Sequence, residues 1–435
     1  MTLKRRDFVK IAGLQVGLLA GCRSAGPLPF VPPGPLPPEP DPRPTKNGGT
    51  ADVIVIGAGA FGGWTAYHLQ QLGMKVLLVD AYGPGNSRST SGDETRGVRS
   101  SYGDRTGEQA EQWMRWARLA MTRWREWDAE WKPQLKTQLF YETGDIIMRK
   151  AEENFTKRTK DLWTKLGVKH EVFKGDEVQK RWKIFNTTDI QEVLYEPDAG
   201  VVRARRACES VAEVYKSRGG ELRIAHAWLG TQNGGKLDHL ILSTNEIVSA
   251  GTYVFACGPW LPKLFPELLG RVIRTPMGSV FYYATPPADD RFTFPNCPSW
   301  NYPGVTGWPS LLPDNRGFRV RTGGERLYDP DYSSRWIPEK AMKASRTFVK
   351  EHFPILATSP INETRSCHYE LSSTRNFLID KHPGLSNVWI TGGGNAEAFK
   401  FGPVLGDYIA KRVHGEAGDP KLAAAFRLPK EQPKT

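Results

Sequence analysis

A glycine-rich loop near the start of the chain has the residue types and spacing of a nucleotide-binding turn. Residues 57–62 read GAGAFG, a G-x-G-x-x-G pattern that directly follows a short apolar, β-branched run at residues 52–56. Gly57 would permit a tight turn, Gly59 would let the backbone approach a diphosphate, and Gly62 would let a helix pack closely on the strand. The N-terminus of that helix carries partial positive charge, which suits phosphate groups. The loop therefore predicts a dinucleotide site.

The elements around this loop have the order that such a site needs. A helical pattern runs from the loop to Leu72, and a second predicted strand at residues 75–79 ends at Asp80, twenty-one residues after Gly59. The Asp80 carboxylate could accept hydrogen bonds from a ribose. This order of strand, loop, helix, strand and acid makes a chance match a poor explanation, and both NAD and FAD fit it.

The composition describes a globular protein. The chain of 435 residues is 39% hydrophobic and 24% charged, which allows a large core or two domains and excludes a wholly disordered chain. No run of eighteen apolar residues occurs, so a polytopic membrane protein is excluded. A net charge of +12 is by itself a weak signal for nucleic acid, and we expect no nucleic-acid partner. The cysteines after Cys22 match neither a disulfide scaffold nor a zinc motif, so we expect no metal site.

The N-terminal segment resembles an export address. In residues 1–21, Arg5 and Arg6 precede a mostly apolar stretch too short to span a bilayer, as in a twin-arginine signal peptide. The stretch LAGC that ends at Cys22 resembles a bacterial lipobox, although a generic signal peptide with an incidental cysteine is the alternative. Residues 22–49 form a proline-rich spacer that favours an extended conformation. We therefore expect export by the twin-arginine route and a lipid anchor at Cys22, in the periplasm or cell envelope.

Two later regions of the sequence separate FAD from NAD. The hydroxyl-rich stretch at residues 87–91 is followed by GDETRGVRSSYG at residues 92–103. This stretch resembles the G-D-T-R-x-x-R-x-x-Y-G pattern of the monomeric sarcosine oxidase family of flavoproteins, with one extra residue. That family includes N-methyltryptophan oxidase and the fructosyl amino acid oxidases. SCHY at 366–369, GGG at 392–394 and FKFGP at 399–403 match the family's C-terminal region in order and spacing. A plain NAD dehydrogenase would not explain these distal matches.

The resemblance covers about residues 51–428 and implies an α/β fold. A Rossmann-like FAD-binding domain would be assembled from residues 51–125, 193–262 and 365–415. A substrate domain with a largely antiparallel sheet would come from residues 126–192 and 263–364. We expect residues 416–435 to be a loosely attached tail.

The same resemblance implies where FAD binds. The residues expected to contact it are Gly57, Gly59, Ala60, Phe61, Gly62, Asp80, Ala81, Ser89, Thr90, Ser91, Arg96, Cys367, Gly394, Phe401 and Gly402. Cys367 would be attached covalently to the 8α carbon of the isoalloxazine, and the alternative is a small buried hydrophobe. A proline at position 403 suits the start of a helix, and the preceding glycine loop would leave free amides directed at the flavin ring.

Three cations match or replace the family's catalytic residues. Arg99 and Lys400 match the pair that holds the substrate carboxylate, and the alternative is that each pairs with a protein acid. Arg319 stands where the family has an oxygen-activating lysine, although a register slip of two would put Arg321 there. Fast reaction with oxygen is therefore in doubt.

Other departures predict a rebuilt amine pocket. Glu397 replaces a family histidine, and Thr306 falls where a substrate-contacting tyrosine is expected. Glu397 could bind a cationic or polyhydroxylated part of the substrate, or could be ion-paired. A set of tryptophans at near-helical spacing predicts an amphipathic helix packed on the body, with a carbohydrate platform as the alternative: Trp113, Trp116, Trp124, Trp127 and Trp131.

These observations predict an exported, monomeric FAD enzyme that oxidises the C–N bond of a small secondary amine or amino acid. Water would hydrolyse the imine product, and oxygen would accept the electrons to give hydrogen peroxide. One alternative is a dehydrogenase that passes electrons to a membrane quinone or a periplasmic redox protein. The other is a flavin-containing binding lipoprotein without turnover.

Overall fold

The computed structural model describes residues 46–324 and 329–430. The predicted signal peptide, the lipobox and nearly all of the proline-rich spacer lie outside these residues. Within the described ranges, no helix has the length and apolarity needed to cross a membrane.

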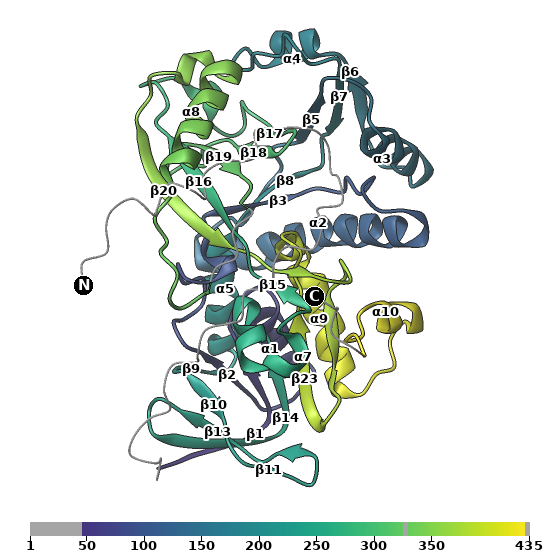
Figure 1. Cartoon of the computed structure of the whole chain (residues 1–435), viewed down its shortest axis with the longest axis vertical. Coiled ribbons are helices and arrows are strands. Elements are labelled where there is room, and N and C mark those ends of the chain that lie inside the picture. The colour runs from purple at the N-terminus through teal and green to yellow at the C-terminus, as the bar shows by residue number, and fades with distance from the viewer. Residues whose placement is uncertain (1–45, 325–328, 431–435) are drawn as a thin grey trace, which may run out of the picture. The chain divides into compact units, whose positions relative to one another are not determined.

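A mixed sheet of eight strands carries the glycine-rich loop (Figure 1). Its five parallel strands run in the order β9-β2-β1-β14-β23. Their bounds are β1 (Lys46–Ile56), β2 (Val76–Asp80), β9 (Glu221–Ile224), β14 (Glu246–Phe255) and β23 (Leu385–Gly392). The other three strands pair antiparallel: β22 (Leu378–His382) on β23, and β13 (Leu240–Leu242) on β14 with β10 (Ala227–Leu229) beyond it.

Both faces of this sheet are covered, because the parallel strands are apolar on both sides. Along β1, Val53 and Val55 belong to one buried cluster, whereas Ile54 and Ile56 belong to another. This alternation is what a strand buried on both faces requires. The helices that contribute to the first cluster include α1 (Gly62–Gln71), α5 (Ala204–Ser217) and α9 (Gly402–His414). The second cluster contains residues of α6 (Leu261–Leu264) and α7 (Pro266–Leu269).

A second sheet of eight strands has the order β20-β16-β19-β18-β17-β5-β7-β6. All neighbouring strands are antiparallel except β17 and β5, so the expected α/β fold with a largely antiparallel second sheet is confirmed. Its strands are β5 (Asp145–Arg149), β6 (Glu171–Phe173), β7 (Glu192–Glu196), β16 (Met277–Tyr283), β17 (Ser299–Tyr302), β18 (Val305–Trp308), β19 (Phe318–Thr322) and β20 (Ile361–His368). Helix α8 (Glu339–His352) contributes to its core.

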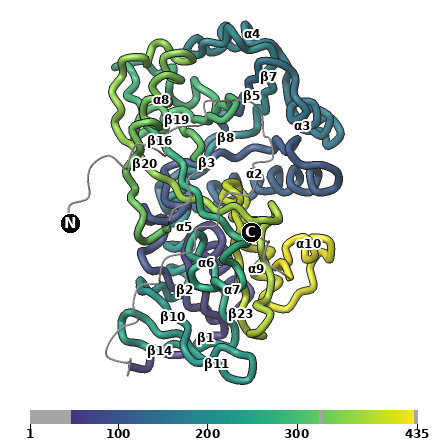
Figure 2. Tube along the Cα trace, in the orientation of Figure 1, coloured from purple at the N-terminus to yellow at the C-terminus, as the bar shows by residue number. Residues whose placement is uncertain are grey.

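The chain passes between the two sheets several times, as Figure 2 traces. It leaves the mixed sheet after β2 and returns at β9, and it leaves again after β14 and returns at β22. The domain boundaries inferred from the sequence stay a prediction. A small antiparallel sheet is made by β3 (Thr95–Val98), β8 (Gly200–Arg203) and β4 (Phe140–Tyr141), in the order β3-β8-β4.

The long helix α2 (Gly107–Leu135) carries the tryptophans that the sequence analysis singled out. All five are buried, at most 8% exposed, so packing on the body is confirmed and a carbohydrate platform on this helix is wrong. The remaining elements are α3 (Asn154–Lys165), α4 (Gly175–Arg181), α10 (Pro420–Ala425), β11 (Gln232–Asn233), β12 (Lys236–Leu237), β15 (Ile273–Arg274) and β21 (Leu371–Ser372).

The expected loose tail is wrong for residues 416–430. Helix α10 lies in this segment, and Phe426 after it is fully buried against the ring of Trp113. The backbone N–H of Leu428 also donates to Asp380 at 3.1 Å. Hydrophobic burial thus fixes a segment that its short, alanine-rich sequence did not single out.

Candidate cofactor and substrate site

The glycine-rich loop has the backbone that the sequence predicted. Gly57 has φ +105°, and a Cβ atom there would lie 2.4 Å from the Ala256 carbonyl oxygen. A Cβ atom on Gly62 would lie 1.9 Å from the Gly57 carbonyl oxygen. Both positions therefore exclude any larger residue, because the turn and the first turn of α1 pack against β14 and against each other.

A cavity lies at the carboxyl ends of β1, β2 and β14. It encloses about 1280 Å³ of empty space, part of it open to solvent. Such a crevice outside the carboxyl ends of parallel strands is where open α/β sheets bind their ligands. The expected cofactor residues that line it are Gly57, Gly59, Ala60, Phe61, Asp80, Ala81, Ser89, Thr90, Ser91, Arg96 and Gly394.

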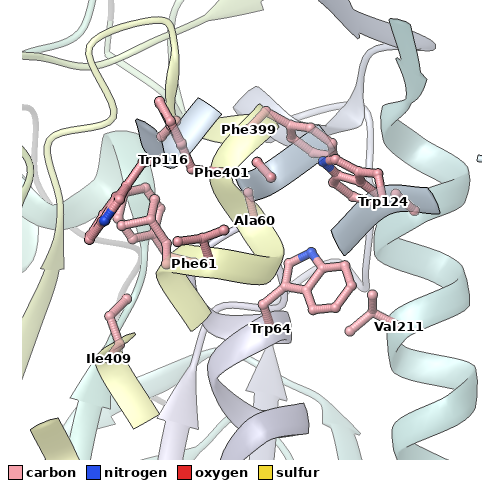
Figure 3. Packing of buried hydrophobic residues seen from close by; sticks show 14 of the residues in the cluster. Ala60, Phe61, Trp64, Trp116, Trp124, Val211, Phe399, Phe401 and Ile409 are labelled. Atoms are coloured by element: carbon pink, nitrogen blue, oxygen red, sulfur yellow. The ribbon is translucent and has the colours of Figure 1, made fainter. Parts of the chain in front are cut away.

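Four expected cofactor residues lie behind the wall of this cavity instead. Gly62 serves the packing of α1, and a Cβ atom on Gly402 would lie 2.6 Å from the indole of Trp64. Phe401 is fully buried in the core beside Ala60, Phe61 and Trp64, as Figure 3 shows. Cys367 is 7% exposed and lies next to the lining residue Arg96. Sequence spacing alone could not separate residues that face the cavity from residues one layer behind it.

The polar lining of the cavity is partly engaged with the backbone. Asp80 accepts hydrogen bonds from the N–H groups of Ala58 at 2.7 Å, Tyr82 at 2.9 Å and Gly83 at 2.8 Å. Burial raises the pKa of Asp80. Ser91 Oγ accepts from the N–H of Ala60 at 3.1 Å. These bonds hold the glycine-rich loop on the second strand.

One polar group at the cavity, the hydroxyl of Thr90, is available to a bound ligand. The hydroxyl of Thr90 is buried and has no hydrogen-bond partner among residues 46–324 and 329–430. A buried unpaired hydroxyl is costly, so a bound polar group that satisfies it is favoured. Together with the glycine cradle and the helix N-terminus, this lining fits a dinucleotide cofactor such as FAD.

The Arg96 guanidinium connects the cavity with Cys367. Its Nη2 donates to Cys367 Sγ at 2.9 Å and to the Thr90 carbonyl at 2.5 Å, and its Nη1 pairs with Asp93. The thiol therefore contacts a cationic side chain that lines the cavity.

Asp93 also holds the second arginine of this region. Arg319 Nη2 donates to Asp93 Oδ2 at 2.6 Å, and the Tyr282 hydroxyl donates to Asp93 Oδ1 at 3.0 Å. Although burial raises the pKa of the Asp93 carboxyl, the charges of Arg319 and Arg96 outweigh it and hold that pKa well below its usual range. The sequence motif contained Asp93, but nothing in it indicated that one carboxylate serves two guanidinium groups.

The register of β19 distinguishes the two candidate arginines. Arg319 lies opposite Tyr282 and Trp308, with its guanidinium 4.6 Å from the Trp308 ring. Arg321 lies opposite Thr306 and approaches the Tyr369 ring instead. Arg319 is 1% exposed, and its Nε and Nη1 have no hydrogen-bond partner in the described part of the chain.

Arg99 and Lys400 come together near this arginine pair. Lys400 is buried, and its Nζ donates to the Tyr102 hydroxyl at 2.6 Å. Burial lowers the pKa of Lys400 to about 8, Glu397 opposes the shift, and the charge of Arg99 lowers it further. Arg99 Nη1 lies 3.9 Å from Asp145, and its guanidinium makes no hydrogen bond to any residue that the structure describes. Neither cation lines the cavity itself, but Phe399, the neighbour of Lys400, does.

Glu397 is ion-paired, as one of its two alternatives predicted, and its contact with a substrate group stays a prediction. Its carboxylate pairs with buried Arg105 and accepts from Trp113 Nε1 at 3.2 Å, although Glu397 also lines the cavity. The expectation of free amides in the glycine loop is wrong for Gly393 and Gly394. Both N–H groups donate to buried Glu370 at 3.1 Å.

Comparison with known proteins agrees with this site. A profile of the family described as "FAD dependent oxidoreductase" matches residues 52–412. The monomeric sarcosine oxidase of Bacillus sp. (strain B-0618) is 25% identical over 373 residues, which are 83% of this chain and 91% of that protein. The N-methyl-L-tryptophan oxidase of Citrobacter koseri is 25% identical over 386 residues, 84% of this chain and 95% of that protein.

Solved structures show the same fold at lower identity. The fructosamine oxidase of Aspergillus fumigatus superposes with a TM-score of 0.75 at 18% identity, covering 87% of this chain and 89% of that one. The L-proline dehydrogenase of P. horikoshii superposes with a TM-score of 0.73 at 16% identity, covering 88% and 97%. With a profile match over residues 52–412 and a cavity built on the glycine-rich loop, the chain belongs to the family of FAD-dependent oxidoreductases.

Proposed function

We propose that this oxidoreductase oxidises the C–N bond of a secondary amine or amino acid that carries a carboxylate. The observation that supports this most is the pair Arg99 and Lys400, two cations without a hydrogen-bonded carboxylate near one end of the cofactor cavity. A substrate carboxylate would supply the missing acceptors, and two cations would fix its orientation. FAD, when bound, supplies the two-electron acceptor.

The side chains then bind and orient rather than transfer protons. Arg99 and Lys400 hold the carboxylate, so the substrate's α carbon is fixed relative to the cavity. No side chain is assigned as a base, and the substrate reacts as the free amine. It loses a hydride equivalent from carbon and a proton from nitrogen, and water hydrolyses the resulting imine to a carbonyl compound and an amine.

An anaerobic screen tests the proposal directly. Secondary amines, amino acids and glycated amines are added to the purified flavoprotein, and loss of the yellow absorbance is recorded. Bleaching by a carboxylate-bearing amine, lost in Arg99→Gln, is expected. Failure of every compound to bleach the flavin would instead favour a flavin-containing binding lipoprotein.

The electron acceptor is either oxygen or a membrane quinone or redox protein. Arg319 supports the second choice, because it replaces the lysine expected from the resemblance and its charge is engaged by Asp93. Hydrogen peroxide formation and dye reduction, measured with one substrate, separate the two. Peroxide equal to the substrate consumed identifies an oxidase, whereas fast dye reduction with little peroxide identifies a dehydrogenase.

We also propose that FAD is attached covalently to Cys367. The thiol lies 2.9 Å from Nη2 of Arg96, a side chain that lines the cofactor cavity, so it is placed where such a bond could form. Yellow colour should stay with acid-precipitated protein and be released in Cys367→Ala. Free FAD from the unaltered protein would contradict the attachment.

Export and anchoring follow from the sequence of residues 1–49. The proposal is a monomer that the twin-arginine route exports folded and that lipid at Cys22 tethers to the cell envelope. Cell fractionation with labelled fatty acid tests it, because Cys22→Ala should remove both the label and the membrane association.

A further inference from the structure

We propose that residues 329–336, here called the latch segment, retain the adenosine half of FAD through ion pairs with Lys263. The segment lies between β19 and α8 in the chain, yet Asp331 within it lines the cofactor cavity. The inference rests on the proposed FAD site and is independent of which substrate is oxidised.

Buried charges fasten the segment to helix α6. Lys263 Nζ lies 2.5 Å from Asp331 and 3.1 Å from Asp329, and the three side chains are only 1%, 7% and 17% exposed. The Lys263 ammonium also lies 4.9 Å from the ring centre of Tyr332. Opening the segment would take both carboxylates away from the buried Lys263 ammonium, and a buried charge without its partners is costly.

Further hydrogen bonds shape the segment and join it to the cavity wall. Asp329 Oδ1 accepts from the N–H groups of Asp331 at 2.8 Å and Tyr332 at 3.0 Å. Asp331 Oδ1 accepts from Trp260 Nε1 at 2.7 Å, and Trp260 lines the cavity as well. One carboxylate of the segment therefore bridges the α6 lysine and an indole in the wall.

The neighbours of Asp331 indicate which end of the cofactor lies there. Tyr82, which follows the predicted ribose-binding Asp80, has its ring 6.1 Å from that of Trp260 and 5.1 Å from that of His226. All three aromatic residues line the cavity, and such rings suit a planar base. Asp331 therefore brings the latch segment to the adenosine end of the cavity rather than to the end near Lys400.

One cation of the segment has a donor left for a ligand. Arg335 Nη1 is buried without a hydrogen-bond partner among the described residues, and its Nη2 donates to the Pro330 carbonyl at 2.9 Å. The positive charge of Arg88 acts on Arg335, and Arg88 lies over the Tyr82 ring. The two guanidinium groups thus lie near each other and near Tyr82 and Asp331, which line the cavity.

The experiment measures FAD release rather than turnover. All variants carry Cys367→Ala, so that release is observable whether or not the wild-type cofactor is covalent. Lys263→Met removes the central charge, and Asp331→Asn keeps the size and the acceptor for Trp260. After dilution, the rise of free-FAD fluorescence should be at least about tenfold faster in both variants than in the parent.

A lysine with the same pairing elsewhere provides the matched control. Lys160 also bridges two acids, Glu152 at 2.5 Å and Glu192 at 2.8 Å, but it does not line the cavity. Lys160→Met should release FAD at the parental rate. Circular dichroism confirms that each variant is folded.

Equal release rates in the folded parent, Lys263→Met and Asp331→Asn would overturn the proposal. So would an acceleration by Lys160→Met as large as that by Lys263→Met. If the protein with Cys367 intact binds FAD but oxidises no amine, the proposed reaction is refuted while this test stays valid. If the protein with Cys367 intact binds no FAD, the cofactor site and the latch are refuted together.

Discussion

Two groups of cations lie near the cofactor cavity, and they differ in what neutralises them. Arg96 and Arg319 share the buried carboxylate of Asp93. Arg99, only three residues after Arg96, and Lys400 have no carboxylate within hydrogen-bonding distance among the residues described. The ion pairs of Asp93 organise the protein, whereas Arg99 and Lys400, which have no hydrogen-bonded carboxylate in the described ranges, are available to the carboxylate of a ligand.

Removing the shared carboxylate should have the largest effect. Asp93→Asn leaves the buried Arg319 and the partly buried Arg96 without their shared counter-charge, and we expect the free energy of unfolding to fall by about 3–5 kcal/mol. Urea denaturation measures it. The control Asp198→Asn breaks a more exposed pair with Arg118 and should cost at most about 1 kcal/mol. Equal losses of unfolding free energy in Asp93→Asn and Asp198→Asn would contradict a special structural role for Asp93.

The next largest effects are expected when Arg99 and Arg96 are each replaced by glutamine, because the two arginines have different roles. Arg99→Gln should raise the KM for a carboxylate-bearing amine between about tenfold and a hundredfold, because a charge-assisted hydrogen bond is lost. The free energy of unfolding should change by less than about 0.5 kcal/mol. Arg96→Gln should destabilise the fold instead. If Arg96→Gln raised only the KM and Arg99→Gln lowered only the free energy of unfolding, the roles assigned to the two arginines would be overturned.

Titration of Lys400 provides a smaller test. Its pKa of about 8 means that it is mostly cationic at pH 7 and neutral at pH 10, so carboxylate binding should weaken as the pH rises through 8. We expect acetate affinity, followed by the flavin absorbance, to fall by about tenfold between these values. Acetate carries no amine, so its own titration does not interfere. In Lys400→Arg, the guanidinium stays charged and the decline should disappear.

The smallest effect concerns the shape of a paired cation. Arg319→Lys keeps the charge beside Asp93 but loses the planar group over the Trp308 ring. We expect a loss of about 1 kcal/mol in the free energy of unfolding. A loss as large as that of Asp93→Asn would mean that guanidinium geometry, rather than charge, holds this region.

The sequence predicted those features that depend on local backbone conformation. Gly57 and Gly62 were predictable because a left-handed φ and a close approach exclude side chains, and the strand, helix, strand order placed them. The family resemblance then predicted that Arg96, Cys367 and Lys400, which are far apart in the sequence, lie in one region of the fold. Local backbone rules and a family pattern were enough to predict the glycine-rich loop and to choose FAD rather than NAD.

Partners that lie far apart along the chain were not predictable. The bonds from Arg319 to Asp93 and from Lys400 to Tyr102 span 226 and 298 residues. No periodicity encodes such pairings, because they depend on how two sheets are brought together. The same reason explains why the buried Glu370, which takes the amides of Gly393 and Gly394, was missed.

The strand order of the mixed sheet has a consequence for how the chain is made. Strand β1 emerges early in synthesis, but its neighbour β14 pairs Lys46 with Glu246, and β14 in turn needs β23 at Leu385–Gly392. Until those segments exist, β1 has an open apolar edge that invites aggregation. Such long-range pairing folds slowly. A nascent chain must therefore be protected until nearly its last strand has been synthesised, and truncation before β23 would leave the sheet unfinished.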